Sequence, residues 1–312
     1  MNTRMILILG VTASGKGQLA FSLAESLGAE IISIDSMKVY KRMDIGTAKP
    51  PKEARKRVRH HLIDVVEPSE SFSVATFLDL AQKAIKQIGN RNRPIIAVGG
   101  TALYIKALLY GLFEGPGTDE QIRSGLRARA QIEGLTQLHR ELAQVDPAAA
   151  KRINPNDSKR IIRALEVFRT AGKPISSLQK QFAMEKPLHN WTIIGLRRQK
   201  IEENKRINAR VKKMLADGLV DEIKSLLAEE KPLSPQARCA IGYAEIINYL
   251  NGQMNLEEAT ELIKKNTRRL AKSQRTWFRT FKNVYWLDIE PGEPTEEILG
   301  RAKRLVNHIQ AR

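Results

Sequence analysis

Cysteine is almost absent from this chain of 312 residues, and its five histidines are scattered. The single thiol, Cys239, excludes an internal disulfide. The histidines and this thiol together show no spacing that resembles a structural zinc site. We therefore interpret the adjacent pair His60 and His61 as part of a strand edge rather than as metal ligands.

The chain also lacks a long apolar run. The opening run, residues 5–10, is too short to span a bilayer and leads straight into a glycine-rich loop, so it is interpreted as a buried strand and not as a signal peptide. A hydrophobic content of 42% and a mean hydropathy of -0.35 are typical of a globular protein. We expect a cytoplasmic, monomeric protein with two compact units and no membrane partner.

Acidic residues are scarce. Lys and Arg number 52 against 34 Asp and Glu, which gives a net charge of +18. No acidic residue stands between Glu261 and Asp288, whereas this stretch contains Lys264, Lys265, Arg268, Arg269, Lys272, Arg275, Arg279 and Lys282. Because the excess is clustered, a polyanionic partner is favoured over a merely soluble enzyme with basic surfaces.

Short apolar runs predict an α/β fold. They are rich in Ile and Val, and helical patterns separate them, which favours a parallel sheet with helices on both faces. The runs are MILILG (5–10), EIISID (30–35), HLIDVV (61–66), PIIAVGG (94–100), WTIIGL (191–196) and VYWLDI (284–289).

The strand pattern stops between about Leu112 and Leu188, which indicates a helical insertion. Its most regular helical patterns are residues 141–153 and 158–172. Gly-Pro-rich residues 114–119 and the segment 185–190 bound it. We therefore predict a core in two parts, residues 1–111 and 189–312, around an insertion at 112–188. Helices return after Gln199, the first of them closing on a glycine cap at Gly218.

The loop GVTASGKGQ follows the first strand and precedes an amphipathic helix. Its G-x-x-x-x-G-K spacing predicts a phosphate cradle of backbone amides, a helix N-terminus and the Lys16 ammonium, with an incidental glycine turn as the alternative. Thr12 and Ser14 can also face the anion. Gly17 stands where the motif has a hydroxyl that holds Mg²⁺. The predicted diphosphate site is Gly10, Val11, Thr12, Ala13, Ser14, Gly15, Lys16 and Gly17.

Two further polar residues follow predicted strands. Asp35 ends the second strand, at the sheet edge where open α/β folds bind ligands, so it is a candidate base or metal ligand. A helix or turn cap at Asp35 or Ser36 is the alternative. Thr101, after Gly99 and Gly100, could donate to a leaving oxygen or simply cap the next helix.

These motifs resemble those of the tRNA dimethylallyltransferases, also called tRNA isopentenyltransferases. The resemblance is collinear over almost the whole chain. The segments that carry it are GVTASGK, DSMKVYKRMDIGTAKP, HHLIDVVEPSESFSVATF, VGGTALY, SKRIIRALEVFRTAGKP, RINARVKKMLADGLVDE, RCAIGYAE and TRRLAKSQRTWFR.

The resemblance implies a P-loop-containing three-layer fold with a helical insertion domain and a helical C-terminal region. It implies Mg²⁺ as cofactor and transfer of the dimethylallyl group of dimethylallyl diphosphate to the exocyclic amine of the adenine just 3′ of a tRNA anticodon. The residue matching Asp35 takes the amine proton, Thr101 contacts the leaving oxygen, and Lys16 with Arg206 or Arg210 clamps the diphosphate. The alternative for either arginine is a solvated helix face.

The resemblance also implies where tRNA binds. The residues from Asp35 to Lys38 would line the pocket of a flipped-out adenine, and a segment of the insertion would grip the anticodon stem-loop. In the last segment Arg268, Lys272, Arg275 and Arg279 form one basic helical face; for Trp277 a core position is favoured. The family's tRNA contacts match Asp35, Ser36, Met37, Lys38, Thr101, Arg123, Lys159, Arg160, Ile161, Ile162, Arg163, Arg238, Cys239, Ala240, Ile241, Gly242, Tyr243, Lys272, Ser273, Gln274, Arg275, Thr276, Trp277, Phe278 and Arg279.

Four residues depart from the family pattern, all inside these motifs. Gly17 replaces Ser or Thr, Lys38 replaces Gln, Ala102 replaces Gly, and Ser273 replaces Arg. One hypothesis is a working prenyltransferase with altered metal use, in which Lys38 or another nearby cation partly replaces the charge of magnesium. The alternatives are a catalytically weakened tRNA-binding homologue, a prenyltransferase of free adenine nucleotides, a small-molecule P-loop kinase and a pure RNA-binding protein.

Overall fold

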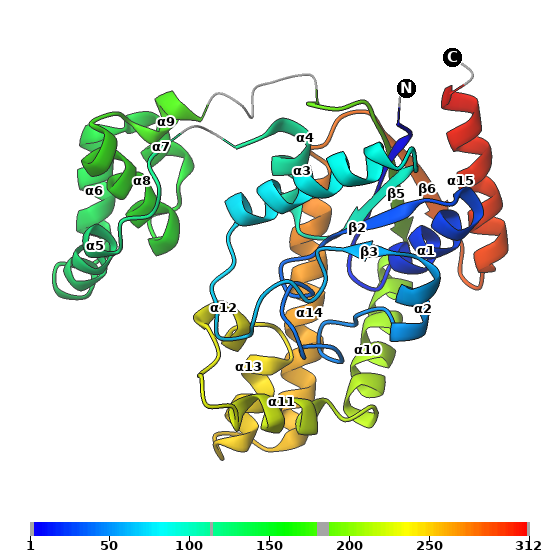
Figure 1. Cartoon of the computed structure of the whole chain (residues 1–312). Helices are drawn as coiled ribbons and strands as arrows, with labels where there is room; N and C mark the ends of the chain where they lie inside the picture. Colours follow the sequence, from blue (N-terminus) through cyan, green and yellow to red (C-terminus); the bar gives the residue numbers. More distant parts are fainter. Residues whose placement is uncertain (1–2, 113–114, 180–186, 311–312) are drawn as a thin grey trace. The chain divides into compact units, whose positions relative to one another are not determined.

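The computed structural model describes residues 3–112, 115–179 and 187–310. The chain divides into two compact units (Figure 1). Residues 1–109 together with 188–312 form one unit, and residues 110–187 form the other. The expected linkers at 114–119 and 185–190 begin with residues that lie outside the described ranges. In the part of the chain described here, no helix is long and apolar enough to cross a membrane.

The first unit contains a sheet of six parallel strands in the order β3-β2-β4-β1-β5-β6. The central strand β1 pairs with β4 on one side, where Met5 lies opposite Ile95, and with β5 on the other, where Met5 lies opposite Trp191. This arrangement confirms the predicted α/β fold. The strands are β1 Met5–Gly10, β2 Glu30–Ile34, β3 His60–His61, β4 Ile95–Gly99, β5 Trp191–Arg198 and β6 Val284–Ile289.

The strand predicted at 61–66 is wrong for most of its length. Only His60 and His61 pair with β2, and Val66 makes a single bridge to Tyr40. Leu62 and Asp64 have left-handed φ angles of 62° and 57°, which an extended strand cannot contain. The segment has the apolar pattern of a strand, but its backbone turns at Leu62 and again at Asp64, so it does not stay extended.

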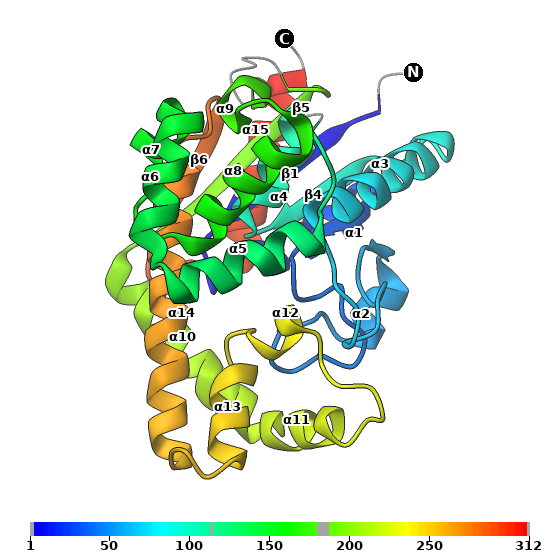
Figure 2. The same ribbon diagram turned by 90° about the vertical axis from the view of Figure 1, so that its left-hand side faces the viewer.

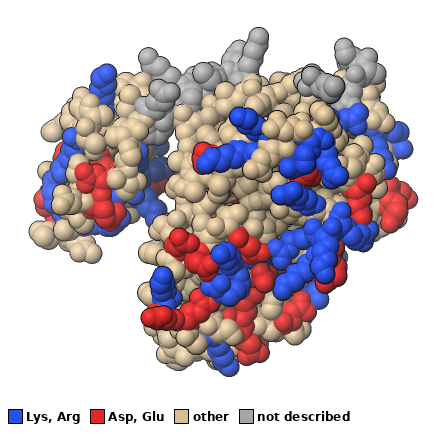
Figure 3. Space-filling view, in the orientation of Figure 1, with Lys and Arg blue, Asp and Glu red and all other residues tan. Residues whose placement is uncertain are grey.

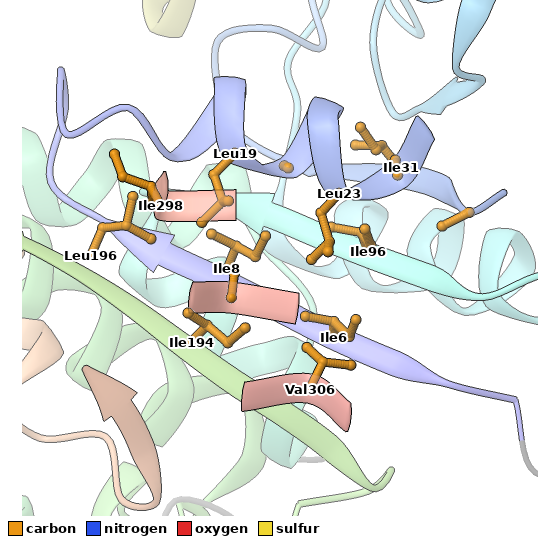
Figure 4. Packing of buried hydrophobic residues seen from close by; sticks show 14 of the residues in the cluster. Ile6, Ile8, Leu19, Leu23, Ile31, Ile96, Ile194, Leu196, Ile298 and Val306 are labelled. Atoms are coloured by element: carbon orange, nitrogen blue, oxygen red, sulfur yellow. The ribbon is translucent and has the colours of Figure 1, made fainter. Parts of the chain in front are cut away.

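Two layers of helices cover the sheet (Figure 1). On one face, α1 (Lys16–Leu27) and α15 (Thr295–Gln310) enclose a core in which Leu19, Leu23 and Val306 meet Ile6 and Ile8 (Figure 4). The other face is covered by α3 (Val74–Asn90) and α14 (Leu256–Phe278), which contact β2, β4 and β1. Both faces of the sheet are therefore covered by helices and shielded from solvent, as is usual for a parallel sheet.

Further helices of this unit gather around α14. The helix α10 packs along α14, and α13 packs against both α11 and α14 (Figure 2). The predicted glycine cap is confirmed: α10 ends at Ala216, Asp217 follows, and Gly218, with a left-handed φ of 98°, ends the helix and opens α11. The remaining helices of this unit, of which α10 and α13 contact α14, are α2 Lys52–Arg57, α4 Ala102–Tyr110, α10 Lys200–Ala216, α11 Leu219–Leu227, α12 Pro235–Arg238 and α13 Tyr243–Leu250.

The second unit is helical throughout its described residues. Its helices are α5 Glu120–Ile132, α6 Leu135–Val145, α7 Pro147–Arg152, α8 Ser158–Ala171 and α9 Ile175–Leu178. The single helix expected at 141–153 is two helices, because Asp146 ends α6 and its Oδ1 accepts the Ala149 amide at 2.9 Å to cap α7, where Pro147 is the first residue. Leu126, Leu142 and Leu165 belong to the buried core of this unit.

Candidate active site

The predicted phosphate cradle is a strand–loop–helix turn. The chain leaves β1 at Gly10 and enters α1 at Lys16. In between, Ala13 and Gly15 have left-handed φ angles of 63° and 96°. The first amides of a helix have no intrahelical acceptor, so those at the start of α1 are available to an anion, and the helix dipole adds to their attraction.

Three arginine side chains, one from β5 and two from α10, hold this loop in place by hydrogen bonds. Arg206 Nε donates to the Ala13 carbonyl at 2.8 Å, Arg198 Nε donates to the Ser14 carbonyl at 2.9 Å, and Arg210 Nη2 donates to Thr12 Oγ1 at 2.6 Å. Arg206 and Arg210 come from α10, as the RINAR segment predicted. Arg198 was missed, although its position at the carboxyl end of β5 could have indicated it.

Gln274 of α14 fixes the loop from inside. Its side chain is buried; its Oε1 accepts the Thr12 amide at 2.7 Å, and its Nε2 donates to the Gly100 carbonyl at 2.9 Å. The side chain thus joins α14 to the cradle and to the end of β4. Gln274 is among the expected tRNA contacts; the structure gives its side chain a scaffold role, because both ends of the amide are hydrogen-bonded within the protein and the residue is only 7% exposed.

We expect Gln274→Leu to destabilise the fold by roughly 1–3 kcal/mol, because it leaves a buried amide and a buried carbonyl without partners. Thermal unfolding measures this. The matched control is Ser273→Ala on the exposed side of the same helix, which we expect to unfold within about 0.5 kcal/mol of the wild type. Equal effects of the two substitutions would contradict the role given to Gln274.

Asp35 follows β2 and organises the turn that begins there. Its Oδ1 accepts the amides of Met37 at 2.9 Å and Lys38 at 3.3 Å. Within the described residues its Oδ2 makes no hydrogen bond, so one carboxylate oxygen holds the turn while the other can accept a proton. The capping role and the proton-accepting role are therefore compatible.

Thr101 connects the ends of β4 and β2. Its Oγ1 accepts the Ser36 amide at 3.2 Å, which leaves the hydroxyl hydrogen free to be donated elsewhere. Its backbone carbonyl accepts the amide of Ile105 at the start of α4. Thr101 therefore stands at the backbone position that opens α4, while its hydroxyl binds the turn after β2, so a capping position and a role beside the cavity are compatible.

A cavity of about 1160 Å³ brings these segments together. Such a volume exceeds that of a usual small-molecule pocket and can hold an allylic diphosphate and a base. Its apolar lining includes Val98, Met214 and Leu270. Its polar lining includes Thr12, Lys16, Asp35, Lys38, Arg206, Arg210 and Cys239.

The cavity is strongly cationic. Burial, together with the nearby Lys38 and Arg210, lowers the pKa of Lys16 to about 7. Burial also lowers the pKa of Lys38 and of Arg210, against the opposing effect of Asp35. Lys16 Nζ donates to the Val11 carbonyl at 3.2 Å. An incoming anion would favour the charged forms of these groups, because it offsets the burial and mutual repulsion that lower their pKa values.

The basic face predicted on α14 is smaller than expected. Arg275 forms an ion pair with Glu203, and Arg268 Nη1 donates to Asn208 Oδ1 at 2.8 Å, so both turn toward α10. Phe278 is buried, and Trp277, favoured for the core, is half-buried with Lys106 Nζ 6.0 Å from its ring centre. Within the expected tRNA-contact segment 272–279, the exposed residues are Lys272, Ser273, Thr276 and Arg279.

The segment 238–243 also contains both exposed and buried residues. Arg238 and Cys239 are exposed, whereas Ala240, Gly242 and Tyr243 are buried. The Tyr243 hydroxyl donates to Glu222 Oε1 at 2.6 Å, and the same carboxylate accepts the amides of residues 44–46. Tyr243 therefore supports the loop that lines the cavity.

In the helical unit, Lys159 and Arg160 are exposed, whereas Ile161 and Ile162 belong to the core. Arg123 and Arg163 both bind the carboxylate of the buried Glu166, at 3.0 and 2.8 Å. Of the residues expected to contact tRNA here, the two isoleucines have their side chains in the core of this unit. Much of the positive charge of Arg123 and Arg163 is balanced within the unit.

A basic patch that the sequence reading passed over lies on α2. Lys and Arg side chains gather over this helix in Figure 3, and its last turn contains Arg55, Lys56 and Arg57. Arg57 also lines the cavity. The run KEARKRVR at 52–59 could have indicated this patch, because it holds five basic residues against one acidic residue.

The donor set does not fit a divalent ion held by the protein. Among the described residues, no three His, Cys, Asp or Glu side chains lie together. Gly17 offers no hydroxyl, and Lys16, Lys38 and Arg210 lie around Asp35, the carboxylate beside the cradle. A cation at Asp35 would meet three like charges, whereas Mg²⁺ needs an octahedron of oxygen ligands.

Comparison with known proteins places the chain in a family. The family model described as IPP transferase matches residues 38–281. The chain belongs to this family. It is 46% identical to a tRNA dimethylallyltransferase of Geobacter metallireducens over 93% of this chain and 94% of the relative, and 44% identical to that of Pelotomaculum thermopropionicum over 98% and 97%.

Solved structures of the IPP transferase family are also similar. A tRNA isopentenylpyrophosphate transferase from Bacillus halodurans is 40% identical, with a TM-score of 0.70 and 98% of each chain covered. A eukaryotic dimethylallyltransferase described as acting on tRNA is 26% identical, with a TM-score of 0.82, over 98% of this chain and 80% of that one. The resemblance seen in the sequence is therefore confirmed.

Proposed function

We propose that this chain transfers the dimethylallyl group of dimethylallyl diphosphate to the exocyclic amine of the adenine just 3′ of a tRNA anticodon. The observation that carries the proposal is the cavity into which the phosphate cradle and Asp35 both open. A kinase would need only the phosphate cradle, and a pure RNA-binding protein would need only the basic surface. Neither would need the cradle and the basic surface together with a proton-accepting carboxylate such as Asp35. The names of the relatives support the same reaction.

The phosphate cradle would bind the diphosphate as the leaving group of the transfer. As the bond between the allylic carbon and the diphosphate oxygen breaks, negative charge grows on that oxygen and positive charge on the carbon. The loop amides, Lys16 and Arg210 are placed to stabilise the oxygen charge, and the Thr101 hydroxyl can donate to the leaving oxygen. The adenine nitrogen forms the new bond to carbon, and Asp35 Oδ2 accepts the proton that the nitrogen loses.

The adenine has to leave its stack to reach the cavity. The turn from Asp35 to Lys38 lies in the cavity wall and would receive the base. Exposed cations at Arg238, Lys272 and Arg279 would bind the RNA backbone, and Lys159 with Arg160 on the helical unit would contact the anticodon stem-loop. The family resemblance implies Mg²⁺ as counter-charge for the diphosphate, but the described side chains around the cradle do not fit an ion held by the protein, so no step of the transfer is assigned to it.

Substrate competition tests the proposal. Purified protein is given labelled dimethylallyl diphosphate with unmodified tRNA, with AMP, or with both. We expect label in tRNA alone, since the exposed basic residues serve no purpose for a free nucleotide. Label in AMP instead would favour the free-nucleotide prenyltransferase, and tRNA binding without any transfer would favour the weakened homologue.

The affinity for inorganic diphosphate should fall as pH rises above about 7. Lys16 loses its proton there in the free protein, and a bound anion favours the charged form, so binding above pH 7 must take up a proton. The loss should approach tenfold per pH unit until the raised pKa of the complex is reached. Calorimetry between about pH 6 and about pH 9 measures it. Lys16→Met should retain only the pH dependence of the ligand itself, and identical profiles for the two proteins would refute the assignment.

A further inference from the structure

Lys38 stands on a backbone that is fixed at the edge of the cavity. Its amide donates to Asp35 Oδ1 at 3.3 Å, and its carbonyl accepts the Asp64 amide at 3.2 Å. The next residue, Val39, accepts the amides of Val65 and Val66 through its carbonyl. The side chain therefore starts from a defined position and lines the same cavity as Lys16 and Arg210.

The other lysines of this segment are already neutralised. Lys41 binds Glu67 at 2.6 Å, and the buried Lys49 binds Asp44 at 2.7 Å and Asp64 at 2.6 Å. Lys38 has no carboxylate within 4.0 Å among the residues that the structure describes. The charged and titratable groups that face it are Asp35, Arg210, Lys49, Lys16 and His60. Four of these are basic residues and only Asp35 is acidic, so the positive charge around Lys38 is not balanced and would attract an entering anion.

The cradle, in turn, lacks the hydroxyl that normally holds a divalent ion there. Packing does not explain the absence, because a Cβ added at Gly17 would meet no atom within 4 Å. A diphosphate bound here still needs counter-charge. Lys16, Arg206 and Arg210 supply part of it, and Lys38 is the cation that the turn after β2 adds to the cavity wall.

We propose that the Lys38 ammonium takes over the counter-charge of a divalent ion, so that this cavity binds diphosphate without a divalent metal. An ammonium can donate three hydrogen bonds to phosphate oxygens and is already tethered, so it requires no ligand octahedron. The inference rests on the proposed function only in taking diphosphate as the anion. The experiment that tests the inference measures only the binding of diphosphate and needs no transfer to tRNA.

Calorimetry with inorganic diphosphate tests it, in EDTA and in excess Mg²⁺. The wild type should bind within about threefold under both conditions. Lys38→Gln should weaken binding in EDTA by about tenfold or more, the size of a lost charge-assisted hydrogen bond, and Lys38→Arg should restore most of it. In the double variant Gly17→Ser with Lys38→Gln, Mg²⁺ should recover the affinity, because the loop regains its hydroxyl ligand.

Lys41→Gln is the matched control, since it removes a lysine of the same segment that does not line the cavity; its binding should equal that of the wild type. Wild-type binding that weakens tenfold in EDTA, or fails under both conditions, would overturn the inference. So would unchanged diphosphate binding in Lys38→Gln with weaker tRNA binding, which would assign residue 38 to the base. A wild type that binds diphosphate without metal but modifies no tRNA would contradict the proposed function and leave the inference intact.

Discussion

Replacing Asp35 with Asn should lower the turnover number by about 10²- to 10⁴-fold, the usual contribution of a general base. Asparagine keeps an oxygen that can accept the Met37 and Lys38 amides, so the turn after β2 should survive. It removes the proton-accepting carboxylate. Single-turnover transfer to tRNA measures the loss, and diphosphate and tRNA affinities should stay within about threefold of the wild type.

Asp35→Ala separates the two roles of this side chain. It removes both the base and the capping oxygen, so it should lose about 1 kcal/mol of stability in addition to activity. Asp35→Asn should unfold at the wild-type temperature. Near-wild-type turnover in Asp35→Asn would show that another group takes the proton and would sink the mechanism proposed above.

Lys16→Met should lower turnover by about 10²- to 10³-fold, comparable to the loss of one donor from a site that stabilises a developing oxyanion. Lys16 is the only basic residue of the loop 10–18, so no other cation within the loop can replace it. Transfer under single-turnover conditions measures the effect. Lys205→Met on the exposed side of α10 is the control and should transfer at the wild-type rate.

The stability of Lys16→Met should move in the opposite direction. Burial and neighbouring cations lower the pKa of Lys16 to about 7, so folding opposes its charge, and its presence costs stability below pH 10. Methionine should therefore unfold at the same temperature as the wild type or higher. A clearly less stable variant would mean that the Lys16 contact to the Val11 carbonyl holds the loop, and the loss of activity would then have a structural cause.

Local patterns predicted much of the core. Residues 5–10 form a strand because every side chain is apolar, and the loop that follows is fixed by its own glycines, so strand, cradle and helix could all be expected. The apolar pattern at 61–66 was less informative, because the left-handed residues Leu62 and Asp64 are neither Gly nor Asn. Asp146 shows the same limit: a cap followed by proline divides the expected helix.

The contacts around the cradle depend on residues far away in the sequence. Gln274 reaches Thr12 across 262 positions, and Arg198 reaches Ser14 across 184. Helical spacing correctly put Arg268 and Arg275 on one face, but spacing does not tell that α10 covers this face with Asn208 and Glu203. The motif residues could thus be named from sequence, whereas their division into scaffold and exposed contact required the fold.

The most direct measurement uses two tRNAs that differ only in the base 3′ of the anticodon, adenine in one and guanine in the other. Each is incubated with the full-length protein, dimethylallyl diphosphate and Mg²⁺, digested to nucleosides and analysed by mass spectrometry. We expect dimethylallyladenosine from the adenine tRNA and no prenylated nucleoside from the other. Absence of product from the adenine tRNA, with RNA binding intact, would contradict the proposed function.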